Sequence, residues 1–335
     1  MKSAVVRNIK AIASRKHAAI LTYHGVHSEP LPFKLWTQLS AVAFEEQMAH
    51  LAKHFNCVAF SKLLQYLEER ALPPRTVVIT FDDGFLNNYT TAYPILEKYG
   101  LPATIFLSAG FIGTDRIIWS ERLACIVSLL RDETFSYRDQ VFSIADVAER
   151  SRLFRVIAGD LKQHHHHIID DHIEQLMRDA DLSLKDVNAS TMYHNLRLMN
   201  WAQISELVSG GLIEIGAHTV NHTILSRLSE QEAEDEISRS KDIIEHHVND
   251  VPYFAYPNGG VADYGQEHRC MAERAGFKAV VNAMLGTVTV NSDPYDLHRL
   301  SIGSDCSLKE FDYLLNGGAL FHKNASMLNI IRHLF

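Results

Sequence analysis

Residues 76–84 read Thr76-Val-Val-Ile-Thr-Phe-Asp-Asp-Gly84, an apolar run that ends in two carboxylates and a glycine. Its first six residues are apolar or β-branched, which is typical of a strand buried on both faces of a parallel sheet. Ligands of α/β folds bind at the carboxyl ends of such strands, and Asp82 and Asp83 stand at that end. Two adjacent carboxylates are costly to bury unless a cation or a proton offsets their repulsion. The alternative interpretation is an ordinary Asp-Asp-Gly turn at the end of a strand.

The sequence on both sides alternates between strand and helix patterns. Short apolar runs predict further strands at residues 18–23, 104–107, 212–215 and 279–282. This alternation predicts a parallel sheet, either open or closed into a barrel. Helical spacing predicts helices between the strands. Three of them are placed at residues 44–55, 93–99 and 266–275. Three more begin after predicted N-caps at Ser61, Asn200 and Ser229.

Between residues 118 and 198 the pattern changes, because helical periods dominate and strand-like runs are few. We expect a mostly helical insertion into one barrel domain that spans residues 18–310. The run His164–His167 falls inside this insertion. Four consecutive helical side chains point in different directions and cannot all reach one ion, so we expect a solvated helix face there.

The composition excludes some classes of protein. The chain has 335 residues, 47% of them hydrophobic, and a net charge of −8, whereas a general nucleic-acid binder is basic. Its four cysteines form no C-x-x-C pair, which favours reduced thiols in a cytosol. The first residues lack the apolar core of a secretory signal. We therefore predict a cytoplasmic protein, with peripheral contact to the inner face of the membrane as a further expectation.

That membrane contact would come from the two ends of the chain. Residues 1–17 are basic and place Val5, Ile9 and Ile12 on one helical face, as in segments that lie on anionic membranes. Residues 311–335 are predicted to form a C-terminal helical tail with a similar apolar stripe. The alternative is that both ends dock on the domain itself.

A second set of polar residues follows the strand predicted at residues 212–215. The sequence Gly216-Ala-His-Thr-Val-Asn-His222 places His218 and His222 four residues apart, so that both imidazoles can reach one ion if the segment turns. Such a pair alone is a weak signal in a chain with nineteen histidines. Together with the carboxylates at residues 82 and 83, it makes a His₂-carboxylate set with open positions for water, the arrangement of a catalytic metal.

These motifs carry a resemblance to a known family. The segments TFDDGFLNNYTTAYPILEKYGLPATIFL, LIEIGAHTVNHTILSRLS and PYFAYPNGG resemble those of the NodB-homology polysaccharide deacetylases, also called carbohydrate esterase family 4. The strand end Tyr23-His24-Gly25 and the insertion resemble the exopolysaccharide-biosynthesis branch. The resemblance implies a distorted (β/α) barrel with fewer strands than eight. It also implies removal of N-acetyl groups from amino sugars of the N-acetylglucosamine type.

The resemblance also implies roles for the residues of the first two motifs. Asp82 matches the catalytic base, and Asp83, His218 and His222 match the ligands of a divalent metal. Zn²⁺ is the expected ion, with Co²⁺, Ni²⁺ and Fe²⁺ as alternatives. The metal would polarise the acetyl carbonyl and acidify a water, from which Asp82 takes a proton.

The third motif implies the substrate and oxyanion contacts. The resemblance assigns them to Tyr256, Pro257 and Asn258, with the oxyanion held by a backbone N–H at Asn258, and adds Arg299 from the last strand. The motif departs from the family pattern, because Ala255 stands where an arginine that orients the base is expected. The tryptophan of a fourth motif is also missing, since no tryptophan follows Trp201.

The general acid is the least defined part of the predicted site. His24, at the end of the first strand, and His298, on the last one, are the two candidates, with water or another residue as the alternative. The departures leave two other functions open. One is a metal amidase acting on a small non-sugar amide, and the other is a carbohydrate-binding pseudoenzyme. The substrate could equally be a lipid-linked glycan intermediate or a nucleotide sugar.

Overall fold

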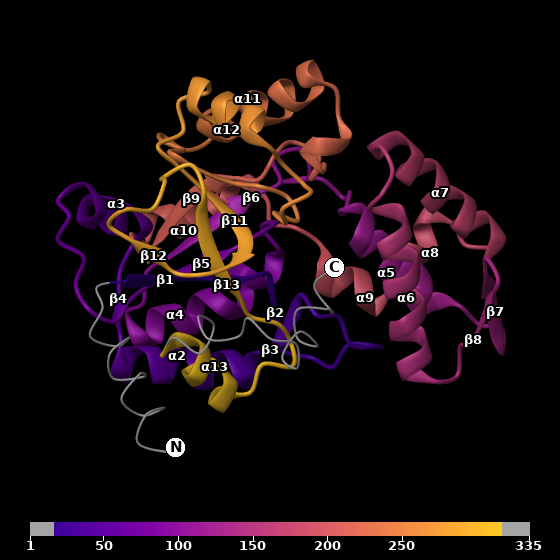
Figure 1. Cartoon of the computed structure of the whole chain (residues 1–335). Helices are drawn as coiled ribbons and strands as arrows, with labels where there is room; N and C mark the ends of the chain where they lie inside the picture. Colours follow the sequence, from indigo (N-terminus) through magenta and orange to yellow (C-terminus); the bar gives the residue numbers. More distant parts are fainter. Residues whose placement is uncertain (1–16, 317–335) are drawn as a thin grey trace, which may run out of the picture.

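The computed structural model describes residues 17–316, and its centre is a closed barrel of parallel strands (Figure 1). Each barrel strand pairs in parallel with both neighbours, in the order β1-β13-β11-β10-β9-β6-β5, and β5 pairs with β1 to close the ring. This confirms the predicted (β/α) barrel with fewer strands than eight. The seven barrel strands are β1 (His17–Tyr23), β5 (Thr76–Phe81), β6 (Ala103–Leu107), β9 (Ile213–Ala217), β10 (Tyr253–Ala255), β11 (Ala279–Leu285) and β13 (Leu297–Ser301).

Side chains alternate between the barrel interior and the outer face, as the pleat of a strand requires. Val78 of β5 packs in an interior cluster, whereas Ile79 packs in the larger cluster outside. Thr80 and Asp82 follow Val78 at a spacing of two and therefore share its inward direction. The interior cluster contains one or two residues of each of several strands, among them Ala18, Ile20, Phe106, Ala255, Val281 and Leu297.

Helix α3 (Phe60–Glu68) packs on this interior cluster through Phe60, whose ring lies 4.6 Å from that of Tyr253. The helix begins at Phe60 after Ala59, so the N-cap predicted at Ser61 is wrong. The helix therefore begins two residues earlier than predicted, with the fully buried ring of Phe60 as its first side chain. The Ser61 backbone N–H instead donates to the carboxylate of Glu214, which supplies the cap from strand β9.

The remaining elements surround the barrel or extend its sheet. Asn200 and Ser229 are N-caps with complete capping boxes, as predicted. The helices are α2 (Ala41–His54), the π-helix η1 (Asn88–Ala92), α4 (Tyr93–Tyr99), α10 (Trp201–Ser209), the 3₁₀ turn η2 (Leu225–Arg227), α11 (Glu230–Glu245), α12 (Gln266–Arg274) and α13 (Leu308–Leu315). The accessory strands are β4 (Asn56–Cys57) beside β5, β12 (Val288–Thr289) antiparallel to β1, and the pair β2 (Gly25–His27) and β3 (Gln38–Ser40).

An insertion between β6 and β9 forms a body of its own beside the barrel (Figure 1). It leaves from the carboxyl end of β6, which is the rim where the predicted site residues lie. It contains an antiparallel hairpin that the sequence pattern did not predict, β7 (Thr134–Tyr137) with β8 (Gln140–Ser143). Its helices are α5 (Trp119–Leu129), α6 (Val147–Leu161), α7 (His166–Asp179), α8 (Leu184–Asn188) and α9 (Thr191–Leu196).

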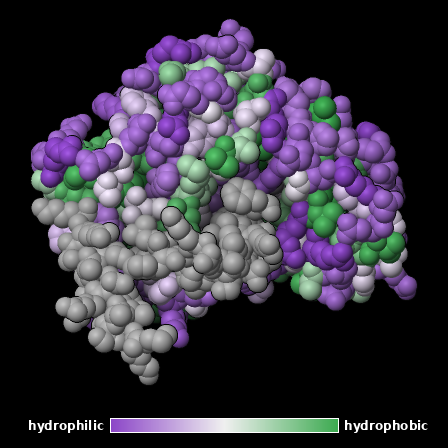
Figure 2. Space-filling view, in the orientation of Figure 1, coloured by the Kyte–Doolittle hydropathy of each residue, from purple (hydrophilic) through white to green (hydrophobic). Residues whose placement is uncertain are grey.

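On the face shown in Figure 2, the described surface is mostly hydrophilic, with hydrophobic residues in scattered patches. None of the helices described between residues 17 and 316 combines the length and apolar character needed to cross a bilayer. The amphipathic N-terminal segment predicted at residues 1–17 lies outside the described residues except for its last one. Most of the C-terminal tail, from residue 317 on, lies outside them as well.

Candidate active site

Two loops at the carboxyl rim of the barrel bring together the carboxylates and imidazoles predicted from the sequence. Asp82 and Asp83 follow β5, and His218 and His222 follow β9, with β6 between the two strands. His218, Asp82 and Asp83 are 2–3% exposed. Residues 135 to 140 positions apart in the chain therefore share one buried site because parallel strands end at the same edge.

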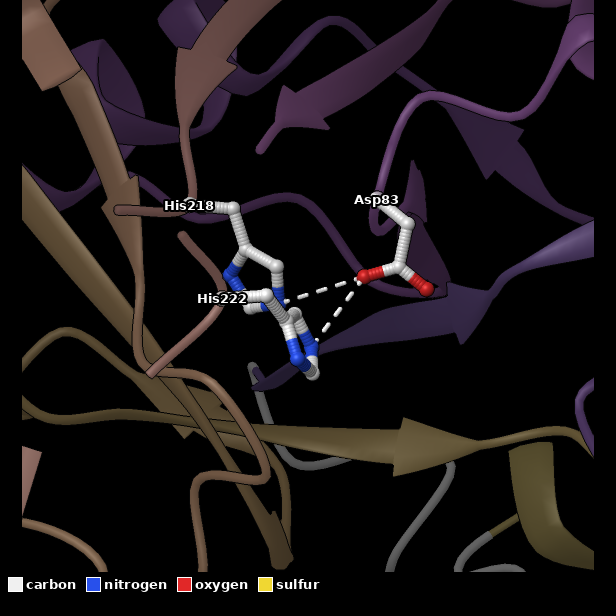
Figure 3. Close-up of side chains that lie close together, drawn as sticks. All are labelled: Asp83, His218 and His222. Carbon is white, nitrogen blue, oxygen red and sulfur yellow. Dashed lines mark ion pairs between the residues drawn. The ribbon is translucent and has the colours of Figure 1, made fainter. Parts of the chain in front are cut away.

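Asp83, His218 and His222 point toward one another and have the geometry of a metal site (Figure 3). Oδ1 of Asp83 lies 3.7 Å from Nε2 of His218 and 3.3 Å from Nε2 of His222. Nδ1 of His218 lies 2.8 Å from the carbonyl oxygen of Ala255 and donates to it, which leaves Nε2 as a free lone pair. Oδ1 of Asp83 is buried and accepts no hydrogen bond. This donor set fits a divalent cation of the zinc type.

The charge balance of these three residues agrees with that fit. Burial lowers the pKa of both His218 and His222, so both imidazoles are neutral, the form that binds a metal. Burial, followed by the negative charges of Glu121 and Asp82, raises the pKa of Asp83 well above its usual range. A divalent cation would supply the positive charge that this carboxylate lacks. Within the described residues, no other group of three or more possible ligands converges in this way, and the run His164–His167 is not part of one.

The loops that carry the site hold unusual backbone conformations. Asp83, Thr219, His222 and Asn258 have φ angles of 76°, 62°, 53° and 59°, in the left-handed region that residues with a side chain rarely adopt. Each such residue costs of order 1–3 kcal/mol, and strain of this kind clusters at functional sites. The cost falls on the turns that aim the ligand side chains.

The carboxylate of Asp82 is paired with Arg299, which the family resemblance had assigned to the substrate contacts. Nη1 and Nη2 of Arg299 donate to its two carboxylate oxygens at 2.8 and 2.7 Å, and Nε donates to the carbonyl oxygen of Asn282 at 2.7 Å. Burial by itself would raise the Asp82 pKa, but the positive charge of Arg299 and its hydrogen bonds to the carboxylate hold it well below its usual range. Asp82 is therefore ionised.

Arg299 thus occupies the place of the base-orienting arginine that is missing at Ala255. The expectation that Arg299 contacts substrate is not met, because its side chain is 1% exposed and lies beneath Asp82. One signal in the sequence could have identified it. Arg299 is two residues from the inward-facing Leu297, so the pleat of the strand points its side chain into the barrel. A buried guanidinium there needs a carboxylate as its counterion.

The third motif contributes one residue to the pocket rather than three. Asn258 lines the pocket, and its Nδ2 is buried without a hydrogen bond. Tyr256 is one residue past the inward-facing Ala255 and points the other way, with its ring stacked 4.0 Å from that of Tyr264. Pro257 is also buried and is absent from the pocket wall. The placement of Tyr256 and Pro257 against substrate is therefore not supported.

The two histidines considered as general acids lie in different places. His24 lines the pocket, its Nδ1 is buried without a hydrogen bond, and its ring meets Trp36 edge-on at 5.9 Å. Burial lowers the pKa of His24 to about 4, although Asp82 opposes the shift. His298 lies between Leu297 and Arg299, which both face inward, so its own side chain points outward. It does not line the pocket.

The pocket has a volume of about 180 Å³ and lies between the barrel rim and the insertion. The insertion contributes Glu121, which is 6% exposed and whose pKa burial raises to about 7. None of the insertion residues was predicted to take part in the site. The pocket is lined from the barrel by Thr22, His24, Leu35, Trp36, Thr37, Asp82, Asp83, His218, His222, Asn258, Ala283 and Ser301, and from the insertion by Trp119, Ser120, Glu121, Phe154, Arg155, Ala158, Gly159 and Lys162.

Solved structures share this fold. Streptococcus pyogenes deacetylase PplD, solved with acetate, superposes with a TM-score of 0.59 at 18% identity, covering 89% of this chain and 98% of that one. IcaB from Ammonifex degensii gives a TM-score of 0.56 at 18% identity, covering 90% and 96%. At these identities the likeness establishes the fold.

Sequence relatives and a family model establish more. The chain is 22% identical over 249 residues to YxkH of Bacillus subtilis (strain 168), a protein described as a polysaccharide deacetylase, covering 74% of this chain and 59% of that protein. A poly-β-1,6-N-acetyl-D-glucosamine N-deacetylase of Staphylococcus aureus is 37% identical over 78 residues, 23% of this chain and 27% of that protein. The polysaccharide deacetylase family model matches residues 69–146 and 156–280, which is more than half of the chain. With its barrel and rim motifs in place, the chain belongs to the polysaccharide deacetylase family.

Proposed function

We propose that this protein is a metal-dependent deacetylase that hydrolyses the N-acetyl groups of amino sugars in a polysaccharide or a glycan precursor. One observation carries the proposal. A buried, ionised carboxylate, Asp82, lies next to a convergent Asp83, His218 and His222 ligand set in a pocket of about 180 Å³. A purely structural metal site has no use for a second, charged carboxylate beside it.

Asp83, His218 and His222 would hold the ion, which we propose to be Zn²⁺. When bound, it supplies a Lewis acid for the acetyl carbonyl and lowers the pKa of water toward neutrality. Three protein ligands leave room for water and substrate in the coordination shell. Both imidazoles are already neutral, so no proton has to leave a histidine before the metal binds.

Asp82 is proposed to take the proton from the attacking water. Arg299 holds both of its oxygens, which fixes the carboxylate plane and keeps the group charged. As the water oxygen bonds to the acetyl carbon, the carbonyl oxygen becomes negative. Asn258, whose strained loop forms part of the pocket wall, is proposed to donate a hydrogen bond to that oxygen through its backbone N–H.

His24 is proposed to pass a proton to the amine nitrogen. Its pKa of about 4 means that the resting imidazole is neutral, so the proton that Asp82 takes from the water must reach His24 during the reaction. The negative charge that develops beside it in the tetrahedral state favours the protonated form. Transfer of that proton to nitrogen breaks the C–N bond and yields acetate and a free amine. His298, which faces away, has no place in this sequence.

The amino-sugar substrate is inferred from family membership and from the name of the Staphylococcus aureus relative, poly-β-1,6-N-acetyl-D-glucosamine N-deacetylase. The chain spans 59% of the length of YxkH. The activity and substrate of the present chain are therefore proposed from its own site and its family. A cytoplasmic location and peripheral membrane contact remain predictions from the sequence.

The test is acetate release from N-acetylglucosamine oligomers by the full chain loaded with Zn²⁺, with and without a chelator. We expect release that stops when the metal is removed and returns when Zn²⁺ is restored. Release only from small non-sugar amides would favour the amidase alternative. Oligomer binding without any release would favour the pseudoenzyme and would contradict the proposal.

A further inference from the structure

Helix α6 of the insertion forms one wall of the pocket. Phe154, Arg155, Ala158, Gly159 and Lys162 all line it, and their spacings of four residues put them on one face of the helix. Ala158 and Gly159 are small, and a methyl group at residue 159 would meet no atom within 4 Å. The wall is therefore open between its two charged residues, and both of these are cationic.

Neither cation has a partner within residues 17–316. Among the described residues, the side chains of Arg155 and Lys162 make no hydrogen bond and come within 4.0 Å of no carboxylate. Other cations of the same helix behave differently. Arg152 lies 3.3 Å from Glu149, and Arg150 donates to backbone carbonyls. The two cations without a partner are the two that face the pocket.

The acids around the pocket are engaged elsewhere. Asp82 is held by Arg299, and Asp83 belongs to the metal-ligand set. Glu121 accepts a hydrogen bond from Ser120 at 2.6 Å, and Asp263 accepts one from the Gly260 N–H at 2.8 Å. Both act on Lys162 only at longer range. A bound divalent ion would add further positive charge to the same pocket.

Lys162 is also partly withdrawn from water. Burial lowers its pKa, with Asp263 and Glu121 opposing the shift. Its charge in turn contributes to the lowered pKa of His24 and of His222, which line the same pocket. A partly buried cation without a counterion is costly, and an anion brought in with the substrate would remove that cost.

We propose that Arg155 and Lys162 form a subsite for a negatively charged group, a phosphate or a carboxylate, attached to the N-acetylated sugar. The inference rests on the proposed deacetylase function and defines its substrate class as an anionic amino-sugar compound rather than a neutral polymer. Seven residues of helix separate the two cations by about 10 Å along the axis. Side chains of their length can close on one anion or on both phosphates of a diphosphate.

The first experiment compares kcat/KM for acetate release by the Zn²⁺-loaded full chain on four probes. One is neutral, N,N′-diacetylchitobiose. The others are N-acetylglucosamine 1-phosphate, uridine diphosphate N-acetylglucosamine, and a disaccharide of N-acetylglucosamine and glucuronate. We expect at least one anionic probe to exceed the neutral one by about tenfold, the scale of one charge-assisted hydrogen bond. Which probe leads distinguishes a phosphate, a diphosphate and a carboxylate.

Two variants and one matched control locate the effect. Lys162→Met and Arg155→Met should each lower the ratio of anionic to neutral kcat/KM by about tenfold, mainly through KM. Arg152→Gln removes a cation from the same helix outside the pocket and should leave the ratio unchanged. An equal loss on neutral and anionic probes, or a loss confined to kcat, would contradict the subsite.

A binding measurement separates this inference from the proposed function. Glucose 1-phosphate has no acetyl group, and its dissociation constant is measured by calorimetry in the same Zn²⁺-loaded proteins. Binding that weakens about tenfold in Lys162→Met and Arg155→Met, but not in Arg152→Gln, supports the subsite even if no probe releases acetate. Acetate release without binding that depends on these cations would overturn the subsite and leave the deacetylase proposal intact.

Discussion

The guanidinium of Arg299 holds the carboxylate of Asp82 through two hydrogen bonds of 2.8 and 2.7 Å, although 217 residues separate them in the chain. The two residues come from β13 and from the end of β5, which flank β1 on opposite sides. The paired geometry fixes the orientation of the carboxylate and keeps it ionised next to the ligand set. A base that is held in this way does not turn to ligate the ion.

Removing Arg299 should destabilise the protein strongly. Arg299→Met leaves the buried Asp82 charge without a partner, and breaking one side of a buried pair costs about 3–5 kcal/mol. In the double variant Arg299→Met, Asp82→Asn, no buried charge is left unpaired, so part of that stability should return. Urea unfolding of the wild type, both single variants and the double variant measures the coupling. Additive effects of the two substitutions would show that the pair is not coupled.

The two neighbouring carboxylates should behave differently when each loses its charge. Asp82→Asn should keep zinc and lose about 10²–10⁴-fold in kcat, since it removes the proposed base. Asp83→Asn should bind less zinc per protein chain, as measured by atomic absorption, because a metal ligand is missing. Loss of zinc from Asp82→Asn with retention in Asp83→Asn would reverse the proposed roles.

The two histidines considered as proton donors provide a matched comparison. His24→Gln should reduce kcat by about 10²-fold or more, because His24 lies in the pocket and the proposed mechanism needs its proton transfer. His298→Gln should retain near wild-type activity and zinc content, since its side chain faces out of the barrel. Steady-state kinetics with zinc analysis checks both variants. The reverse order of effects would assign the proton transfer to the last strand.

His24 should also make stability depend on pH. Its folded-state pKa of about 4 lies below the ordinary value of 6.5, so the unfolded chain binds the proton first as pH falls. The stability of the folded protein is therefore complete above about pH 6.5 and decreases between pH 6.5 and 4. This titration contributes at most about 3 kcal/mol to the free energy of unfolding. Solvent that reaches the His24 ring screens its charge and makes the contribution smaller.

The measurement is urea unfolding of the metal-free protein at pH 7 and pH 4.5. His24→Gln should flatten the pH dependence in this window relative to the wild type, because glutamine does not titrate. His298→Gln serves as the comparison on the outward face. Equal slopes for the wild type and His24→Gln would show that His24 titrates normally in the folded protein.

Local sequence patterns were sufficient wherever the cause is local. The β-branched run at residues 76–81 became strand β5 with identical ends, and the capping boxes at Asn200 and Ser229 begin their helices as predicted. Ser61 failed as a cap because burial of the Phe60 ring, a tertiary contact, set the start of α3. The β7–β8 hairpin in the insertion has few buried side chains and therefore left no strong pattern to detect.

The alternation of strands and helices predicted a parallel sheet, and the Asp-Asp pair and the H-x-x-x-H spacing predicted the ligand set, because these are properties of short segments. The barrel was an expectation from the family resemblance of those motifs, and the surroundings of the ligand set follow from the tertiary structure alone. The pairing of Arg299 with Asp82 and the approach of Lys162 and Arg155 to the pocket join segments far apart in the chain. Such contacts depend on the closure of the barrel and on how the insertion packs against its rim, and no local period in the sequence encodes them.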